Sequence, residues 1–292
     1  MEPIEGKVLG KQVSYPSVYS PDVLVAVPRR LNREQYQLDD ADLPFIGMDV
    51  WHAYETGFIT QKGLPVTGLL KLVYPAGSSC LVESKSLKLY LNSFNMERLG
   101  ETADDGIQLF LKTVGKDLEK LLGVNVEVNF FATKPSHTPS DFYGYKVLEQ
   151  LPGAGDLVFD RFTDAPELLE IAHDRPSEYR VATHLLRSNC KITHQPDWGS
   201  AFIHLKAACS PDVLSVLKYV VSLRNENHFH EEICEMLFKR LSDAYQPDQL
   251  MVACVYTRRG GIDICPVRAS HPHLLPPALA SIGVLSDKLL RQ

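Results

Sequence analysis

The residues with the clearest chemical potential surround a cysteine in the segment RSNCKITHQPDWGS, residues 187–200. Cys190 lies between Arg187 and Lys191, whereas the other cysteines of the second half lie in or beside apolar stretches. Thiolate is the nucleophilic form of cysteine, and nearby positive charge favours it. Asp197, expected in a turn after a proline, would raise the thiol pKa if ionised but could donate a proton to an electrophile if protonated. The pair suggests a nucleophile and a general acid, and the alternative is an exposed loop cysteine.

A second group of polar residues lies in VESKSLKLYL, residues 82–91, at the start of an apolar run. If a helix starts here, Ser84 or Ser86 can serve as its N-cap. The free N–H groups of its first turn, with Lys85 and Lys88 close by, would then suit an anion such as phosphate. Glu83 suits instead a ligand edge that carries N–H donors, as guanine does. The alternative is an ordinary helix cap with solvated lysines.

Histidines and carboxylates gather in RNENHFHEEICE, residues 224–235. His228 and His230 with a neighbouring carboxylate could hold a metal ion, but a zinc site usually needs a third or fourth ligand. No HExxH or paired CxxC motif supplies one, so no metal site is predicted. The segment is then either a polar helix N-terminus or a polar contact to a ligand through His230 and Glu231.

Two arginines, Arg258 and Arg259, precede Gly260 and Gly261 between two apolar stretches. A Gly-Gly pair in this setting predicts a tight hairpin turn. The cationic groups at its tip could hold a phosphate, although an edge hairpin often carries charge for other reasons.

The composition is that of a globular protein with one large or two small domains. The chain has 292 residues, of which 45% are hydrophobic and 23% charged, and its formal net charge is -6. An acidic balance argues against a broad nucleic-acid-binding surface. We find no export signal, no apolar run of membrane-spanning length, no GxGxxG after a strand and no P-loop. Six cysteines without a CxxC pair then favour reduced thiols and a cytoplasmic protein.

Hydrophobic periodicity divides the chain into two similar halves. In the first half, residues 51–60, 64–75 and 124–130 are expected to be strands, and apolar residues at helical spacing predict helices near 87–94 and 107–122, the second ending at Gly123. The second half repeats the order with a strand at 200–208, helices at 212–224 and 230–245, and a hairpin at 249–269. A Pro-, Ser- and Thr-rich loop at 132–146 separates them. We therefore predict α+β domains at residues 1–150 and 151–292.

Four segments together resemble the NADPH-dependent 7-cyano-7-deazaguanine reductases, the nitrile reductases of queuosine biosynthesis. They are ESKSLKLYLNSF (83–94), SNCKITHQPDWG (188–199), RNENHFHEE (224–232) and YTRRGGIDICPVR (256–268). Their order and the length of the chain match the longer, two-module form of the family. The resemblance implies two tandem tunnelling-fold modules, each an antiparallel sheet with two helices on one face.

The resemblance also implies roles for individual residues. Cys190 would attack the nitrile carbon to form a thioimide, Asp197 would donate a proton, and NADPH would deliver hydride twice to give the primary amine. The residues that would bind the substrate are Val82, Glu83, Ser84, His230 and Glu231. Those that would contact NADPH are Ser84, Lys85, Arg259 and Gly260. The family further implies a homodimer and no direct partner in nucleic acid or membrane. His228 is the one departure noted from the family pattern.

Two other functions remain open on sequence alone. The first is a zinc-dependent cyclohydrolase acting on a purine nucleotide, a reaction found on the same fold, which would need a Cys/His zinc site. The second is an oligomeric module that binds a purine-like ligand without catalysis, for which Cys190 would be dispensable.

Overall fold

The computed structural model describes residues 16–133, 135 and 138–292. The expected lack of an export signal concerns residues 1–15, and part of the expected linker concerns residues 134, 136 and 137; both lie outside the described residues. Among the described residues, no helix combines the length and the apolar character that crossing a membrane requires.

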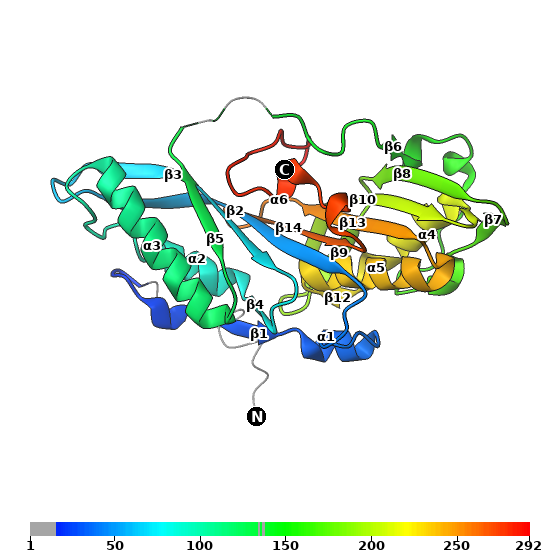
Figure 1. Ribbon diagram of the computed structural model, residues 1–292, viewed down its shortest axis with the longest axis horizontal. Coiled ribbons are helices and arrows are strands. Elements are labelled where there is room, and N and C mark those ends of the chain that lie inside the picture. Colours follow the sequence, from blue (N-terminus) through cyan, green and yellow to red (C-terminus); the bar gives the residue numbers. More distant parts are fainter. Residues whose placement is uncertain (1–15, 134, 136–137) are drawn as a thin grey trace.

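The described chain contains helices and strands in an α+β arrangement (Figure 1). The helices are α1 Arg30–Gln35, α2 Ser84–Asn92, α3 Ala103–Leu122, α4 Val213–Ser222, α5 His230–Tyr245 and α6 Pro277–Ala280. The strands are β1 Ala26–Pro28, β2 Ile46–Ile59, β3 Pro65–Pro75, β4 Cys80–Val82, β5 Glu127–Phe131, β6 Lys146–Val147, β7 Ile171–His173, β8 Ser177–Thr183, β9 Arg187–Cys190, β10 Pro196–Ala207, β11 Ser210–Pro211, β12 Asn227–His228, β13 Gln249–Tyr256 and β14 Ile262–Ala269.

The strands of both halves join in one large mixed sheet. Within the described residues it contains ten strands, with the path β12-β9-β10-β13-β14-β2-β3-β5 and with β8 and β6 attached beside β10. The join is the antiparallel pairing of β14 with β2, which runs from Ile262 opposite Ala53 to Ala269 opposite Ile46 (Figure 1). Pairing these two long edges satisfies backbone groups that separate sheets would leave open.

The expectation of purely antiparallel sheets is wrong in detail. The short pairings of β6 with β8 and of β12 with β9 are parallel. In both cases a two-residue strand adds to an edge after a long excursion of the chain, and such connections allow the parallel direction. The second of these pairings holds the segment before α5 against the end of β9.

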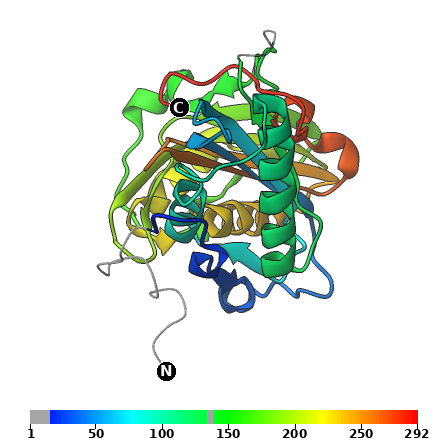
Figure 2. The same ribbon diagram turned by 90° about the vertical axis from the view of Figure 1, so that its left-hand side faces the viewer.

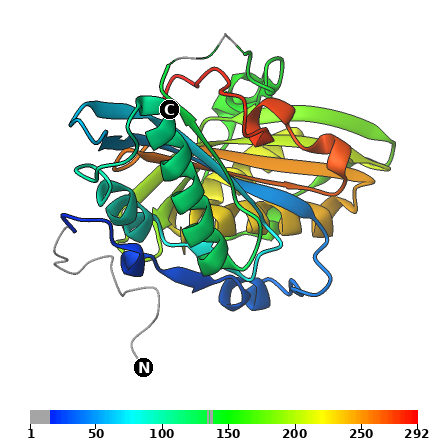
Figure 3. The same ribbon diagram turned by 60° about the vertical axis from the view of Figure 1, so that its left-hand side comes forward.

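Alternation along the strands gives the sheet two different faces. Trp51, Leu72 and Ile264 pack toward α2 and α3, whereas the residues beside them, such as Val50 and Cys265, pack into the opposite core. Helices α4 and α5 cover the second half of the first face. Figures 2 and 3 show the helices on one side of the sheet and the C-terminal segment along the other.

The helix limits follow from local chemistry. Thr102 and Asp105 form a capping box that starts α3, and Gly123 in the left-handed conformation ends it, as expected. The side chain of Asp212 accepts a hydrogen bond from the N–H of Leu214 at the start of α4. The predicted apolar face of α5 is buried. The sequence therefore predicted all four helices of the first face.

Candidate active site

Cys190 ends β9 and is buried, with 2% of its surface exposed, so the alternative of an exposed loop cysteine is wrong. A five-residue connection follows, closed by hydrogen bonds from the N–H of Cys190 to the carbonyl of Gln195 (2.8 Å) and from the N–H of His194 to the carbonyl of Cys190 (2.9 Å). The turn expected at Asp197 is also wrong, because β10 already begins at Pro196 and Asp197 pairs with Ser188 of β9. The hairpin thus fixes the backbones of Cys190 and Asp197 together.

Asp197 is buried beside Arg259 and His230. Its Oδ1 lies 2.6 Å from Nη1 of Arg259, and its Oδ2 lies 3.3 Å from Nε2 of His230. Burial raises the pKa of the Cys190 thiol, but hydrogen bonding from Thr193, from backbone N–H groups of the same loop and from Arg259 outweighs it. The thiol pKa is therefore lowered, which favours the nucleophilic thiolate.

The start of α5 contributes residues to the same site. His230 and Glu231 are its first residues, so the predicted polar helix N-terminus is confirmed, and both side chains are buried. The His230 ring stacks on Tyr256 with centroids 3.9 Å apart. Burial and the nearby Asp49 raise the pKa of Glu231 to about 8. Nδ1 of His230 and Oε1 of Glu231 have no hydrogen-bond partner.

His228 pairs with Cys190 across β12 and β9. Its Nδ1 lies 3.2 Å from Oε2 of Glu232 and its Nε2 lies 3.3 Å from Oε2 of Glu226. Burial would lower the pKa of His228, but these two carboxylates raise it to about 9. The imidazole is therefore charged at neutral pH and holds β12 against the start of α5.

Glu83 is the N-cap of α2, and the expected serine cap is wrong. Its Oε1 accepts from the N–H of Lys85 (3.0 Å) and its Oε2 from the N–H of Ser86 (2.7 Å). Ser84 is the first residue of the helix, so it stands one position too late to cap it. These two N–H groups are engaged by the Glu83 carboxylate and are not open to a phosphate, contrary to the expectation of an anion site made by them. The cap holds Val82 and Ser84 at the site.

Two connected cavities lie at this junction of the two halves. The inner one, of about 20 Å³, is lined by residues that include Trp51, Val82, Ser84, Cys190, Asp197 and Glu231. Glu83 does not line it. The outer one, of about 210 Å³, is lined by Ser84, Lys85, Lys88, Thr193 and Gly260. His230 and Arg259 line both. The structure thus brings together all predicted site residues except the carboxylate of Glu83.

Trp51 is a site residue that the sequence did not reveal. It is buried on β2, and its indole N–H has no hydrogen-bond partner. Together with the unpartnered atoms of His230 and Glu231, it surrounds the inner cavity with unsatisfied polar groups. Such groups are rare in folded proteins unless a ligand or solvent satisfies them. A tryptophan in an apolar strand carries no sequence signal that separates this role from core packing.

Lys88, expected to add positive charge near the start of α2, also contacts the Gly-Gly turn. Its ammonium donates to the carbonyl of Gly260 (2.7 Å) and pairs with Glu55 (2.8 Å). Gly260 and Gly261 have φ of +59° and +78°, and Arg259 and Ile262 exchange backbone hydrogen bonds across them. The predicted Gly-Gly turn is therefore confirmed. Lys88 connects this turn to α2. Its ammonium group also places positive charge on one wall of the outer cavity.

A buried ionic network supports α5 beneath the site. Glu235 accepts from Arg33 (2.7 and 3.0 Å) and from Arg268 (2.9 and 3.1 Å), and Arg268 also binds Asp49 at 2.8 Å. Arg29 pairs with Asp49 as well. These groups come from α1, β2, β14 and α5, so the network links the two halves directly below Glu231.

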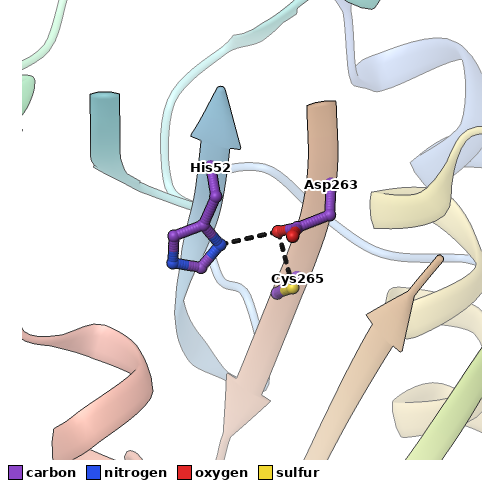
Figure 4. Close-up of side chains that lie close together, drawn as sticks. All are labelled: His52, Asp263 and Cys265. Carbon is purple, nitrogen blue, oxygen red and sulfur yellow. Dashed lines mark hydrogen bonds and ion pairs between the residues drawn. The ribbon is translucent and has the colours of Figure 1, made fainter. Parts of the chain in front are cut away.

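A second titratable cluster lies on the other face of the sheet. Figure 4 shows His52, Asp263 and Cys265 close together, with His52 Nδ1 2.6 Å from Asp263 Oδ1. Among the described residues they are the one group of three metal-ligating side chains near enough to share an ion. Lys288 already pairs with Asp263 at 3.1 Å, and a metal ion would have to displace that ammonium. Neither Cys190 nor His230 belongs to this cluster.

The fold and the site place a buried cysteine of lowered thiol pKa in one small cavity with a carboxyl group, beside an outer cavity lined by lysine and arginine side chains. Residues 15–130 match the family described as "Nitrile reductase, 7-cyano-7-deazaguanine-reductase N-term", and residues 196–273 match "QueF-like protein". Relatives named "NADPH-dependent 7-cyano-7-deazaguanine reductase" include those of Colwellia psychrerythraea (40% identical, 92% of this chain and 93% of the relative), Coxiella burnetii (38%, 92% and 93%) and Acinetobacter baumannii (38%, 94% and 96%). The chain belongs to the family of NADPH-dependent 7-cyano-7-deazaguanine reductases.

Proposed function

We propose that this chain reduces the nitrile of 7-cyano-7-deazaguanine to the primary amine, 7-aminomethyl-7-deazaguanine, through a covalent thioimide on Cys190. The observation that carries the proposal is the buried thiol of lowered pKa that lines one small cavity with Asp197 and the unpartnered Glu231. Family membership supports the substrate and the cofactor. The amine would serve queuosine biosynthesis, and the NADPH requirement suits a cytoplasmic enzyme.

The residues around the inner cavity would hold the substrate ring. Glu231 would accept N–H donors of the deazaguanine edge, and His230 would contact it from the same helix turn. The Val82 and Ser84 backbone would contact the ring from the first half of the chain. Glu83 would also bind the substrate, since each of its carboxylate oxygens has a second lone pair beyond the one that accepts a backbone N–H group in the cap.

The chemistry begins with the Cys190 sulfur adding to the nitrile carbon, which breaks one π bond of the C≡N group and forms a C–S bond. The thiol proton passes to the nitrile nitrogen, with Asp197 placed to carry it. Ser84, Lys85, Arg259 and Gly260 would hold NADPH, which would supply the hydride for each of two reductions at the carbon. Departure of the Cys190 thiol between them would leave an imine, and the narrow inner cavity would limit its contact with water.

The first experiment is intact-protein mass spectrometry after mixing with 7-cyano-7-deazaguanine and no NADPH. We expect an added mass equal to that of the nitrile in the wild type and none in Cys190→Ala. The matched control is Cys80→Ala, which removes a half-buried free thiol outside the site and should keep the adduct. An unmodified wild type would refute the thioimide and favour the binding module or the cyclohydrolase.

We also propose a modular architecture and an oligomeric state for this chain. The two halves, residues 1–150 and 151–292, would be tandem tunnelling-fold modules, and two chains would assemble as a homodimer around a central tunnel. Analytical ultracentrifugation at micromolar concentration should then give twice the mass of one chain, and a monomeric mass would refute this assembly.

A further inference from the structure

Arg259 contacts Asp197 and at the same time lines the outer cavity. Its guanidinium is 2.6 Å from the Asp197 carboxylate, and the two side chains are 38% and 5% exposed. The guanidinium therefore approaches a buried carboxylate from the open side of the site. Arg259 therefore occupies the Oδ1 atom of Asp197, one of the two oxygens through which this carboxyl group could exchange a proton with a ligand.

The backbone that carries Arg259 is fixed, whereas its side chain is the more open partner. The tight Gly260–Gly261 turn and the hydrogen bond from Lys88 hold the hairpin tip. The inner cavity, of about 20 Å³, has room for roughly one water molecule. A two-ring substrate enters only if a lining side chain moves, and Arg259 stands at the junction of the two cavities.

We propose that Arg259 is a positioning residue shared between Asp197 and the phosphates of the cofactor. Without cofactor its guanidinium pairs with Asp197 and hydrogen-bonds the Cys190 sulfur. With cofactor in the outer cavity the phosphates draw the guanidinium away from both groups. This inference rests on the proposed function of the site.

Proton balance favours an Arg259 side chain that can leave Asp197. In the addition step the thiol proton passes to the nitrogen, so no external proton is needed. Each reduction consumes one hydride and one proton, and the proton must reach the nitrogen from a protonated group. A guanidinium that stays on the Asp197 carboxyl group throughout would block that group from delivering the proton.

The other titratable groups around the pair remain in place in both states. Those facing Cys190 and Asp197 are His228 from β12, His230 and Glu231 from α5, and Tyr256 from β13. His228 is fixed between two glutamates and His230 is stacked on Tyr256. Arg259 is therefore the charge that a ligand in the outer cavity is best placed to move.

The test is the pH dependence of Cys190 alkylation by iodoacetamide, read by peptide mass in the full chain with and without saturating NADP⁺. We expect NADP⁺ to raise the titration midpoint of the wild type. Arg259→Gln should show a raised midpoint without ligand and no further response, and Arg259→Lys should keep part of the response. Arg258→Gln is the matched control, because Arg258 stacks on Tyr54 at 3.5 Å, and it should behave as the wild type.

Two results would overturn the inference: a midpoint in Arg259→Gln equal to that of the wild type, or an equal NADP⁺ shift in both. A second readout, thioimide formation without NADPH at neutral pH, should slow about tenfold in Arg259→Gln for each pH unit by which its thiol midpoint rises. The alkylation experiment needs no substrate, so its outcome is separate from failure of the proposed nitrile chemistry, which would show as no adduct in the wild type.

Discussion

Substrate affinity should depend on pH through Glu231. Burial and Asp49 raise the pKa of this carboxyl group, and its Oε1 has no partner in the protein. If the ionised carboxylate accepts hydrogen bonds from the N–H donors of the substrate, a protonated Glu231 must lose its proton before the substrate binds. Below the pKa the ionised fraction falls about tenfold per pH unit, so the apparent Kd should rise about tenfold per unit, or about 1.4 kcal/mol.

The assay is isothermal titration calorimetry with 7-cyano-7-deazaguanine in a Cys190→Ala background, which prevents covalent capture. The slope should appear between about pH 6 and about pH 7.5, below the raised pKa. His228 remains charged over this range because its pKa is about 9. Glu231→Gln should bind more weakly with no such slope, whereas the exposed control Glu167→Gln should retain it.

The stability of the free protein gives an independent check. As pH rises, the stability that Glu231 contributes should fall, whereas the affinity for the substrate should increase. A carboxyl whose folded pKa lies above its unfolded value contributes stability at low pH that is lost as pH rises through the folded pKa. The stability of Glu231→Gln relative to the wild type should therefore increase as pH rises from about 5 to about 8 and change little above that. A flat affinity profile in the Cys190→Ala protein, or an unchanged slope in Glu231→Gln, would refute this role.

Three further predictions concern the frame of the site. Glu235→Ala should lower stability by about 3–5 kcal/mol in chemical denaturation, because it removes the buried carboxylate that two buried arginines share; a loss no larger than that of exposed Asp243→Ala would contradict it. Lys88→Met should raise the KM for NADPH several-fold with little change in kcat, since it frees the turn at Gly260, and an unchanged KM would contradict it. Burial raises the pKa of Asp263, but His52 and Lys288 outweigh this effect and lower the pKa. The stability that this carboxylate supplies is therefore lost as pH falls, and Asp263→Asn should cost less stability in acid than at neutral pH. An equal cost at both pH values would contradict this prediction.

Much of the fold was predictable because the local signals agreed. Apolar spacing, Gly123 and the Gly-Gly turn each act over a few residues and gave α3, α5 and the last hairpin correctly. The motif segments gave the family for the same reason, since they are contiguous in sequence. The sequence did not predict the join of β14 with β2, because nothing within either strand specifies a partner more than 200 residues away.

The site divides in the same way. The sequence by itself determined which residue types could act: a thiol in a basic segment, a carboxyl group near it, and the acid and histidine at the start of α5. Only the tertiary structure decided that Cys190 is buried, that Glu83 caps α2 with both oxygens, and that Arg259 pairs with Asp197. Charge and reactivity depend on burial and on neighbours within a few ångströms, and those neighbours come from β9, β10, α5 and the β13–β14 turn, which only folding brings together.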